Sequence, residues 1–157
     1  MCRTRSLILL LLLVNLASCR YGFVPEGARG VKDVALDPTV NRTPLREAGM
    51  VLDAHLEQAF SDMGMIASGK PYHRLSCSIV SAWRERTTSG SLASTDRYRL
   101  FIRVLAKLSD GAGKVVWQET FSDQGTFSEG GQDEDALEET CRLVSLQIAR
   151  AVAAWEP

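Results

Sequence analysis

Two sets of side chains in this sequence could take part in chemistry. The first is the thiol of Cys19, which follows an apolar run and could be acylated. Arginine offers a planar fork of donors that suits phosphate, so a second set, of cations in the middle of the chain, could hold a polyanion. That set is Arg84, Arg86, Arg97, Arg99, Arg103 and Lys107. Together the two sets indicate a lipid attachment site and a binding site for a polyanion.

Cys19 stands at the end of a secretory signal. Two arginines lie near the start, an apolar run follows at residues 7–14, and Leu-Ala-Ser at 16–18 supplies the small residues of a cleavage site. The run is too short to cross a bilayer, which takes about 20 apolar residues. Leu-Ala-Ser-Cys resembles a bacterial lipobox, in which the cysteine is acylated and becomes the first mature residue. We therefore predict a cleaved signal peptide at residues 1–18 and a covalent lipid on Cys19.

A lipid on Cys19 would hold the protein at a membrane. One acyl chain binds only marginally, and lipobox cysteines typically carry several. The next residue is Arg20, whereas aspartate at that position retains enteric lipoproteins in the inner membrane. We therefore expect the periplasmic face of the outer membrane, with residues 19–30 as a lipid-anchored tether.

The remainder of the chain is one domain in size and nearly balanced in charge. We expect a single domain over residues 31–157. The whole chain carries 18 Lys and Arg against 19 Asp and Glu. A nucleic-acid-binding protein would be strongly basic, so nucleic acid is not an expected partner.

Cys77 and Cys141 are the cysteines left outside the leader and the lipid site. In an oxidising compartment they could form a disulfide if their Cα atoms come within about 7 Å. The alternative is two buried thiols that pack as small apolar side chains. The sequence leaves both alternatives open.

Hydrophobic periodicity predicts helices and strands in a clear order. One helix should begin at Thr43-Pro44, with Thr43 as its N-cap, and end at Gly64. A second should run from about Asp133 to Trp155, with acidic residues at its N-terminus. Strands are expected at residues 31–36, 75–86, 98–108 and 114–121.

The order strand, helix, three strands, helix predicts an α+β fold. Successive strands with short connections should pair antiparallel, and two amphipathic helices need one sheet face to cover. We expect a two-layer sandwich with two helices on one face of a four-stranded mixed sheet, in the order β-α-β-β-β-α. The other sheet face would be open to solvent.

The strand phases predict which side chains lie on that open face. Alternate residues from Tyr98 to Leu108 are apolar, and the residues between them include cations together with Phe101 and Leu105. In the preceding strand we expect Trp83 to share a face with Cys77 and Ile79. The cations, Arg84 and Arg86 included, would then form a strip that suits a polyanionic glycolipid. The alternative is an ordinary solvated sheet face.

Several motifs, taken in order, resemble the LPS-assembly lipoprotein (LptE) family. The resemblance covers nearly all of the mature chain. It departs from the family pattern at Arg20, where many members have glycine, and at Asp37, near the end of the first strand. The motifs are Cys19-Arg20-Tyr21-Gly22-Phe23, Val31 to Pro38, Asn41-Arg42-Thr43, the helix at residues 45–64, Tyr98-Arg99-Leu100 and Gly113 to Trp117.

The resemblance implies a structural role. Members of the family sit as a plug inside a large outer-membrane β-barrel, help that barrel fold, and help it deliver lipopolysaccharide to the cell surface. The implied partners are therefore the LPS-assembly β-barrel, lipopolysaccharide, and the membrane through the lipid on Cys19, with no other cofactor. No basic residue here aligns with a known lipopolysaccharide contact of the family, so the six cations are predicted from charge and strand phase alone.

A second class of function is an outer-membrane lipoprotein that activates a periplasmic peptidoglycan synthase. Some activators share a similar first strand and helix, but they often carry a long disordered linker, whereas this chain has only residues 20–30 there. An enzyme is not expected. His55 and His73 belong to no catalytic cluster, and no group of residues has metal-ligand spacing.

Overall fold

The computed structural model describes residues 31–87, 97–128 and 133–156. The predicted signal peptide, the lipidation site Cys19 and the tether at residues 19–30 lie outside the described residues. Within the described ranges, no helix is long and apolar enough to span a membrane.

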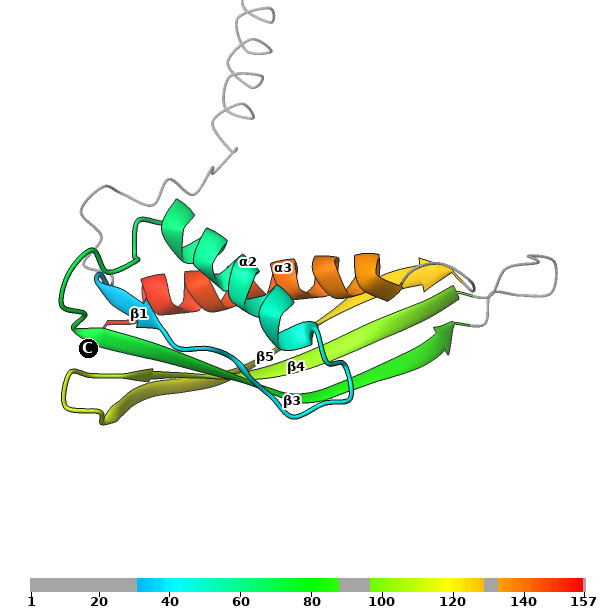
Figure 1. Ribbon diagram of the computed structural model, residues 1–157, viewed down its shortest axis with the longest axis horizontal. Helices are drawn as coiled ribbons and strands as arrows, with labels where there is room; N and C mark the ends of the chain where they lie inside the picture. The colour runs from blue at the N-terminus through cyan, green and yellow to red at the C-terminus, as the bar shows by residue number, and fades with distance from the viewer. Residues whose placement is uncertain (1–30, 88–96, 129–132, 157) are drawn as a thin grey trace, which may run out of the picture.

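Two helices lie on one face of a five-stranded mixed sheet (Figure 1). The sheet order is β1-β3-β4-β5, and β2 pairs with β3 on the same edge as β1. The strands are β1 (Val34–Leu36), β2 (Val40–Asn41), β3 (His73–Thr87), β4 (Arg97–Ser109) and β5 (Val115–Ser128), and the helices are α2 (Ala48–Asp62) and α3 (Asp133–Ala154). This is the predicted α+β sandwich, with one strand more than the four expected.

The additional strand is β2. The first two strands run parallel to β3, while β3, β4 and β5 are antiparallel to their neighbours. Asp37-Pro38 ends β1 as expected, but the chain stays beside β3 and pairs with it again at Val40–Asn41. Two residues are too few to show an alternating pattern, so periodicity could not predict this strand.

Helix α2 begins at Ala48, later than the predicted Thr43-Pro44. Asn41 and Thr43 form a local turn instead: the Thr43 amide and hydroxyl both donate to Asn41 Oδ1, at 2.9 and 2.8 Å. Asn and Thr favour such turns for the same reason that they favour N-caps, because their short side chains bond to nearby backbone. The predicted N-cap was therefore wrong.

The C-terminus of α2 is as predicted. Gly64 has a φ of +64°, the left-handed conformation that glycine adopts without strain. The amide of Met65 donates to the carbonyl of Phe60 and that of Gly64 to Ser61, both at 2.9 Å. These are the two bonds of a Schellman motif, which turns the chain back toward β3.

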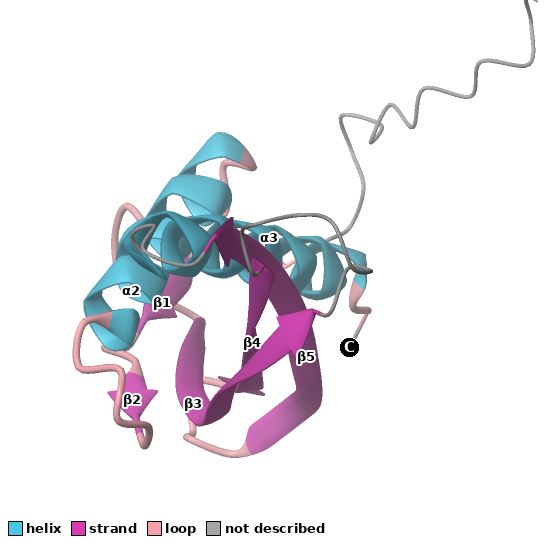
Figure 2. Cartoon of the chain, turned by 90° about the vertical axis from the view of Figure 1, so that its right-hand side faces the viewer, coloured by secondary structure: helices cyan, strands magenta, loops and turns pink. Residues whose placement is uncertain are grey.

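The core lies between the helices and the sheet. Figure 2 shows the two helices together on one side of the curved strands, with β2 at the edge beyond β3. The apolar residues of β4 that face the helices are at most 1 % exposed and alternate as predicted: Leu100, Ile102, Val104, Ala106 and Leu108. The helices cover them with Leu52, Leu56 and Phe60 from α2 and with Val144, Ile148 and Val152 from α3.

Gly125 sets the distance between β5 and α3. A Cβ at this position would lie 2.3 Å from the Ala136 carbonyl oxygen and 2.7 Å from Thr140 Oγ1, both on α3. The Thr140 hydroxyl donates to the same carbonyl at 2.6 Å. The absence of a side chain on Gly125 therefore allows the first turns of α3 to lie directly against the sheet.

A β-bulge at Val80 changes which side chains of β3 face the helices. Ile79 lies opposite Val104 and Ser81 lies opposite Arg103, so Val80 has no partner on β4. The extra residue shifts the alternation of β3 side chains by one position, so each residue beyond the bulge faces the side opposite to the one predicted. The prediction that Trp83 shares a face with Cys77 and Ile79 was wrong, because Trp83 lies beyond the bulge on the opposite face.

Cys77 and Cys141 are free buried thiols, 2 % and 0 % exposed. In the structure the two cysteines are therefore buried thiols and do not form a disulfide. Cys77 lies on β3, near Asp53 of α2, whereas Cys141 lies on α3, which packs on β4 and β5. Burial is the main cause that raises the pKa of each thiol to about 12.

Candidate functional site

The face of the sheet opposite the helices is the candidate site. No helix or strand among the described residues covers this face (Figures 1 and 2). The cations of β4 lie on it as predicted, since they alternate with the buried residues of that strand. We call Arg97, Arg99, Arg103 and Lys107 the cationic stripe.

Arg84 and Arg86 are not part of the cationic stripe. They lie opposite Leu100 and Tyr98 and therefore share the helix-covered side of the sheet. The Arg84 guanidinium forms an ion pair with Asp133 at the start of α3, and its Cζ lies 5.9 Å from the centre of the Phe127 ring. The predicted cluster of six cations was wrong for these two residues, because the bulge at Val80 reverses the phase of β3.

The cationic stripe differs in its charge pairing from three other arginines. Arg74 pairs with Asp37, Arg84 with Asp133, and Arg142 with Glu139. Among the described residues, no ion pair involves any member of the stripe. Glu85, opposite Arg99, is the one carboxylate that β3, β4 and β5 place on this face.

An aromatic pair lies within the stripe. Trp83 and Phe101 face each other across β3 and β4, with ring centres 4.9 Å apart and ring planes within 3° of parallel. The Arg103 guanidinium lies 5.7 Å from the centre of the Trp83 ring, within range of a cation–π interaction. Trp83 is 41 % exposed, so this pair presents apolar surface to solvent. Sequence analysis placed Phe101 here but missed Trp83.

A hollow of about 270 Å³ opens at one end of the stripe. Arg97 and Arg99 line it, together with the hydroxyl-bearing residues Thr87, Thr126 and Ser128. Guanidinium and hydroxyl groups all donate hydrogen bonds, and the guanidinium charge strengthens such bonds to an anion. This hollow therefore has the donor set of an anion-binding site.

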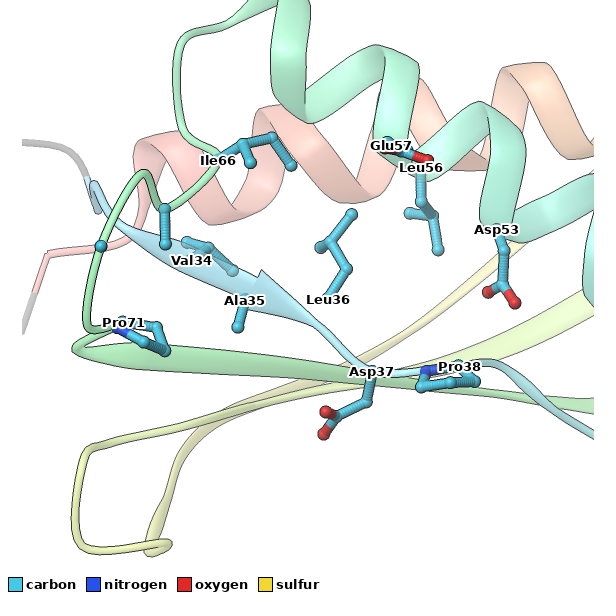
Figure 3. Close-up of a pocket in the computed structure, with 12 residues that line it drawn as sticks. Val34, Ala35, Leu36, Asp37, Pro38, Asp53, Leu56, Glu57, Ile66 and Pro71 are labelled. Carbon is cyan, nitrogen blue, oxygen red and sulfur yellow. The ribbon is translucent and has the colours of Figure 1, made fainter.

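A second hollow, of about 430 Å³, lies beside the edge strand β1 (Figure 3). Leu36 and Leu56 occupy the space between β1 and α2, and the hollow is also lined by Asp37, Asp53 and Glu57. Asp37 pairs with Arg74, and Asp53 accepts the Thr39 amide at 2.9 Å. Asp37 and Asp53 therefore hold the chain around β1 in place.

The two histidines contact structural neighbours. His55 Nε2 lies 3.2 Å from Glu138 Oε1 and links α2 to α3. The His73 ring packs edge-on against Tyr72 and Trp155. Within the described part of the chain, no three His, Cys, Asp or Glu side chains are placed to hold a metal ion.

Comparison with solved structures shows proteins of the same fold. A PelC dodecamer from Paraburkholderia phytofirmans is similar with a TM-score of 0.52 and 20 % identity, over 78 % of this chain and 90 % of that one. A minor lipoprotein from Acinetobacter baumannii has a TM-score of 0.51 and 14 % identity, over 74 % and 91 %. A protein from Xanthomonas campestris has a TM-score of 0.51 and 16 % identity, over 83 % and 86 %.

No protein-family model and no curated protein sequence matches this chain. At the identities above, the structural likeness shows the fold alone. One of the structures that share the fold is named as a minor lipoprotein.

Proposed function

We propose that this protein is an outer-membrane lipoprotein that acts as plug and assembly factor of the β-barrel that transports lipopolysaccharide to the cell surface. The observation that supports the proposal most is the cationic stripe, a row of cations without ion pairs among the described residues. Lipopolysaccharide is a polyanion, and a protein that contacts it needs cations that are not already neutralised.

The arrangement of the two layers also suits this role. Both helices are used to close the core, which leaves one sheet face free for partners. Strand β4 has 13 residues, so at about 3.3 Å per residue this face extends roughly 40 Å along the strand. Opposite the stripe, β5 contributes Ser122, Thr126 and Ser128, whose hydroxyls can bond to sugar or phosphate oxygens.

The resemblance to the LPS-assembly lipoprotein family connects this face to a place in the cell. A lipid on Cys19 would attach the domain to the periplasmic face of the outer membrane, where the barrel and its glycolipid are found. The domain would act there by contact and positioning, and not as an enzyme.

Co-purification tests the proposal. The lipidated protein, tagged after Pro157, is extracted from outer membranes in mild detergent, and its partners are identified. We expect one large β-barrel in equal amount and lipopolysaccharide in the eluate. A cell-wall synthase without a barrel would overturn the proposal and favour an activator.

Variants of the same tagged protein separate the roles of barrel and glycolipid. Replacement of all four stripe residues by serine should lower the bound lipopolysaccharide at least tenfold. The matched control replaces exposed cations elsewhere by serine: Arg42, Lys70, Lys114 and Arg150. Equal losses in the two variants would show that the stripe has no special role.

A further inference from the structure

We infer that the open face binds a disaccharide that carries an anionic group at each end. In this arrangement the sugar rings pack on Trp83 and Phe101, and the anionic groups reach Arg99 on one side and Arg103 on the other. The inference deepens the proposed function and rests on it for the source of the sugar, which would be the headgroup of the glycolipid.

The register of the strands places the necessary groups in three adjacent rows. The middle row is Trp83, Phe101 and Gln124, from β3, β4 and β5 respectively. The row on one side is Ser81, Arg103 and Ser122, and the row on the other is Glu85, Arg99 and Thr126. The aromatic pair therefore lies between two arginines of the same strand.

The spacing of these arginines sets the size of the ligand. Arg99 and Arg103 lie on the same face of β4, about 13 Å apart at a rise of about 3.3 Å per residue. Two linked pyranose rings with a substituent at each end span a comparable length.

The aromatic pair favours a sugar over an isolated anion. Pyranose rings carry C–H groups that pack on aromatic side chains, and large aromatic surfaces contribute most of the energy at many interfaces. Because Trp83 and Phe101 stack face to face, with ring centres 4.9 Å apart, their neighbouring edges form one apolar surface. An inorganic anion would gain nothing from that surface.

The positions at Arg99 and Arg103 should differ in their affinity for an anionic group. Arg99 shares its hollow with Arg97 and with the hydroxyl groups of Thr87, Thr126 and Ser128. Arg103 lies against Trp83 and has Ser81 and Ser122 as its neighbours across the strands. Glu85 lies beside the first position and can accept a bond from a sugar hydroxyl. The hollow should therefore hold the more highly charged end of the ligand.

Direct binding measurements test this inference. The full lipidated protein in nonionic detergent is titrated by calorimetry with a disaccharide phosphorylated at both ends and lacking acyl chains. The comparison probes are the same disaccharide without phosphate, inorganic phosphate, vesicles that contain anionic phospholipid, and a single-stranded oligonucleotide. We expect the bisphosphorylated disaccharide to bind at least tenfold more tightly than either the neutral sugar or inorganic phosphate.

Two substitutions sharpen the test. Trp83→Ala and Arg103→Ser should each weaken disaccharide binding at least tenfold, and Trp83→Phe should recover most of the loss. Met50→Ala and Arg150→Ser are the matched controls, because both residues are exposed and lie on the helices. Thermal unfolding of each variant shows whether it folds as the original protein does.

Three results would overturn the inference. They are equal affinity for inorganic phosphate and the disaccharide, tighter binding to vesicles or oligonucleotide than to the sugar, and an unchanged affinity in folded Trp83→Ala. Failure of the proposed function gives a different pattern, since no barrel would co-purify even if the disaccharide bound as expected.

Discussion

The two faces of the sheet differ in what their side chains contact. On the helix-covered face, Arg84 is paired with Asp133, and apolar side chains fill the space beneath α2 and α3. On the open face, the cationic stripe has no ion pair among the described residues and surrounds a half-exposed aromatic pair. The same three long strands build both faces. One face therefore closes the core, and the other leaves its side chains accessible to solvent.

The largest difference between the faces should appear in stability when neighbouring residues of β4 are truncated. Ile102→Ala removes a fully buried side chain and should lower the free energy of unfolding by about 2–5 kcal/mol. Arg103→Ser, the next residue on the open face, should change it by less than about 0.5 kcal/mol. Urea unfolding followed by circular dichroism measures both. Similar losses for the two variants would contradict the division between the faces.

A smaller effect is expected where β5 touches α3. Gly125→Ala forces a Cβ onto the backbone carbonyl of Ala136, so the helix or the strand must shift, at a cost of about 1–3 kcal/mol. Gly69→Ala is the control, because a Cβ there has no heavy atom within 4 Å. The same urea titration compares the two. A neutral Gly125→Ala would mean that α3 does not lie directly against β5.

The buried thiols provide a chemical test of the helix-covered face. Burial raises the pKa of Cys77 and Cys141 to about 12, so both should stay protonated and unreactive toward an alkylating reagent at pH 8 in the folded protein. In urea both should react within minutes. Mass spectrometry counts the labels, and fast labelling without urea would show that this face opens.

The same thiols make stability depend on pH in a defined direction. The unfolded chain releases their protons near pH 9, whereas the folded chain holds them until about pH 12. The folded state binds more protons in this window, so stability should fall as the pH rises from 9 to 12. Replacement of both cysteines by alanine should reduce that slope, measured by urea titration at each pH.

The smallest effect on binding is expected at Arg84. It has the same side chain as Arg103 but belongs to the helix-covered face, so Arg84→Ser should leave lipopolysaccharide binding within about twofold of the original. Its ion pair with Asp133 is about half exposed, and such pairs contribute about 0–1 kcal/mol. Equal losses for Arg84→Ser and Arg103→Ser would mean that charge alone, irrespective of face, controls binding.

Periodicity was sufficient to predict the layers of this fold. The alternation of Leu100, Ile102 and Val104 and the helical stripe around Val144 and Ile148 are long and regular, so they gave the strand, the helix and the face of each correctly. The end of α2 at Gly64 was also predictable, because glycine adopts the left-handed conformation that ends the helix. Each of these signals is local.

The features that periodicity could not predict depend on tertiary context. The bulge at Val80 has no glycine to mark it, and it alone decides that Trp83 faces outward and Arg84 inward. The turn at Asn41 and Thr43 uses the same residue types as an N-cap, so the sequence could not separate the two. Four of the six predicted cations therefore lie together on the open face, and the two beyond the bulge do not.

Site-specific photocrosslinking in living cells tests the central claim, that the open face is the surface that meets the glycolipid. A photoreactive residue is placed at Gln124, exposed on the open face, or at Arg150, exposed on α3. We expect crosslinks to lipopolysaccharide from position 124 and none from position 150. Crosslinks from position 150 alone, or equally from both, would contradict it.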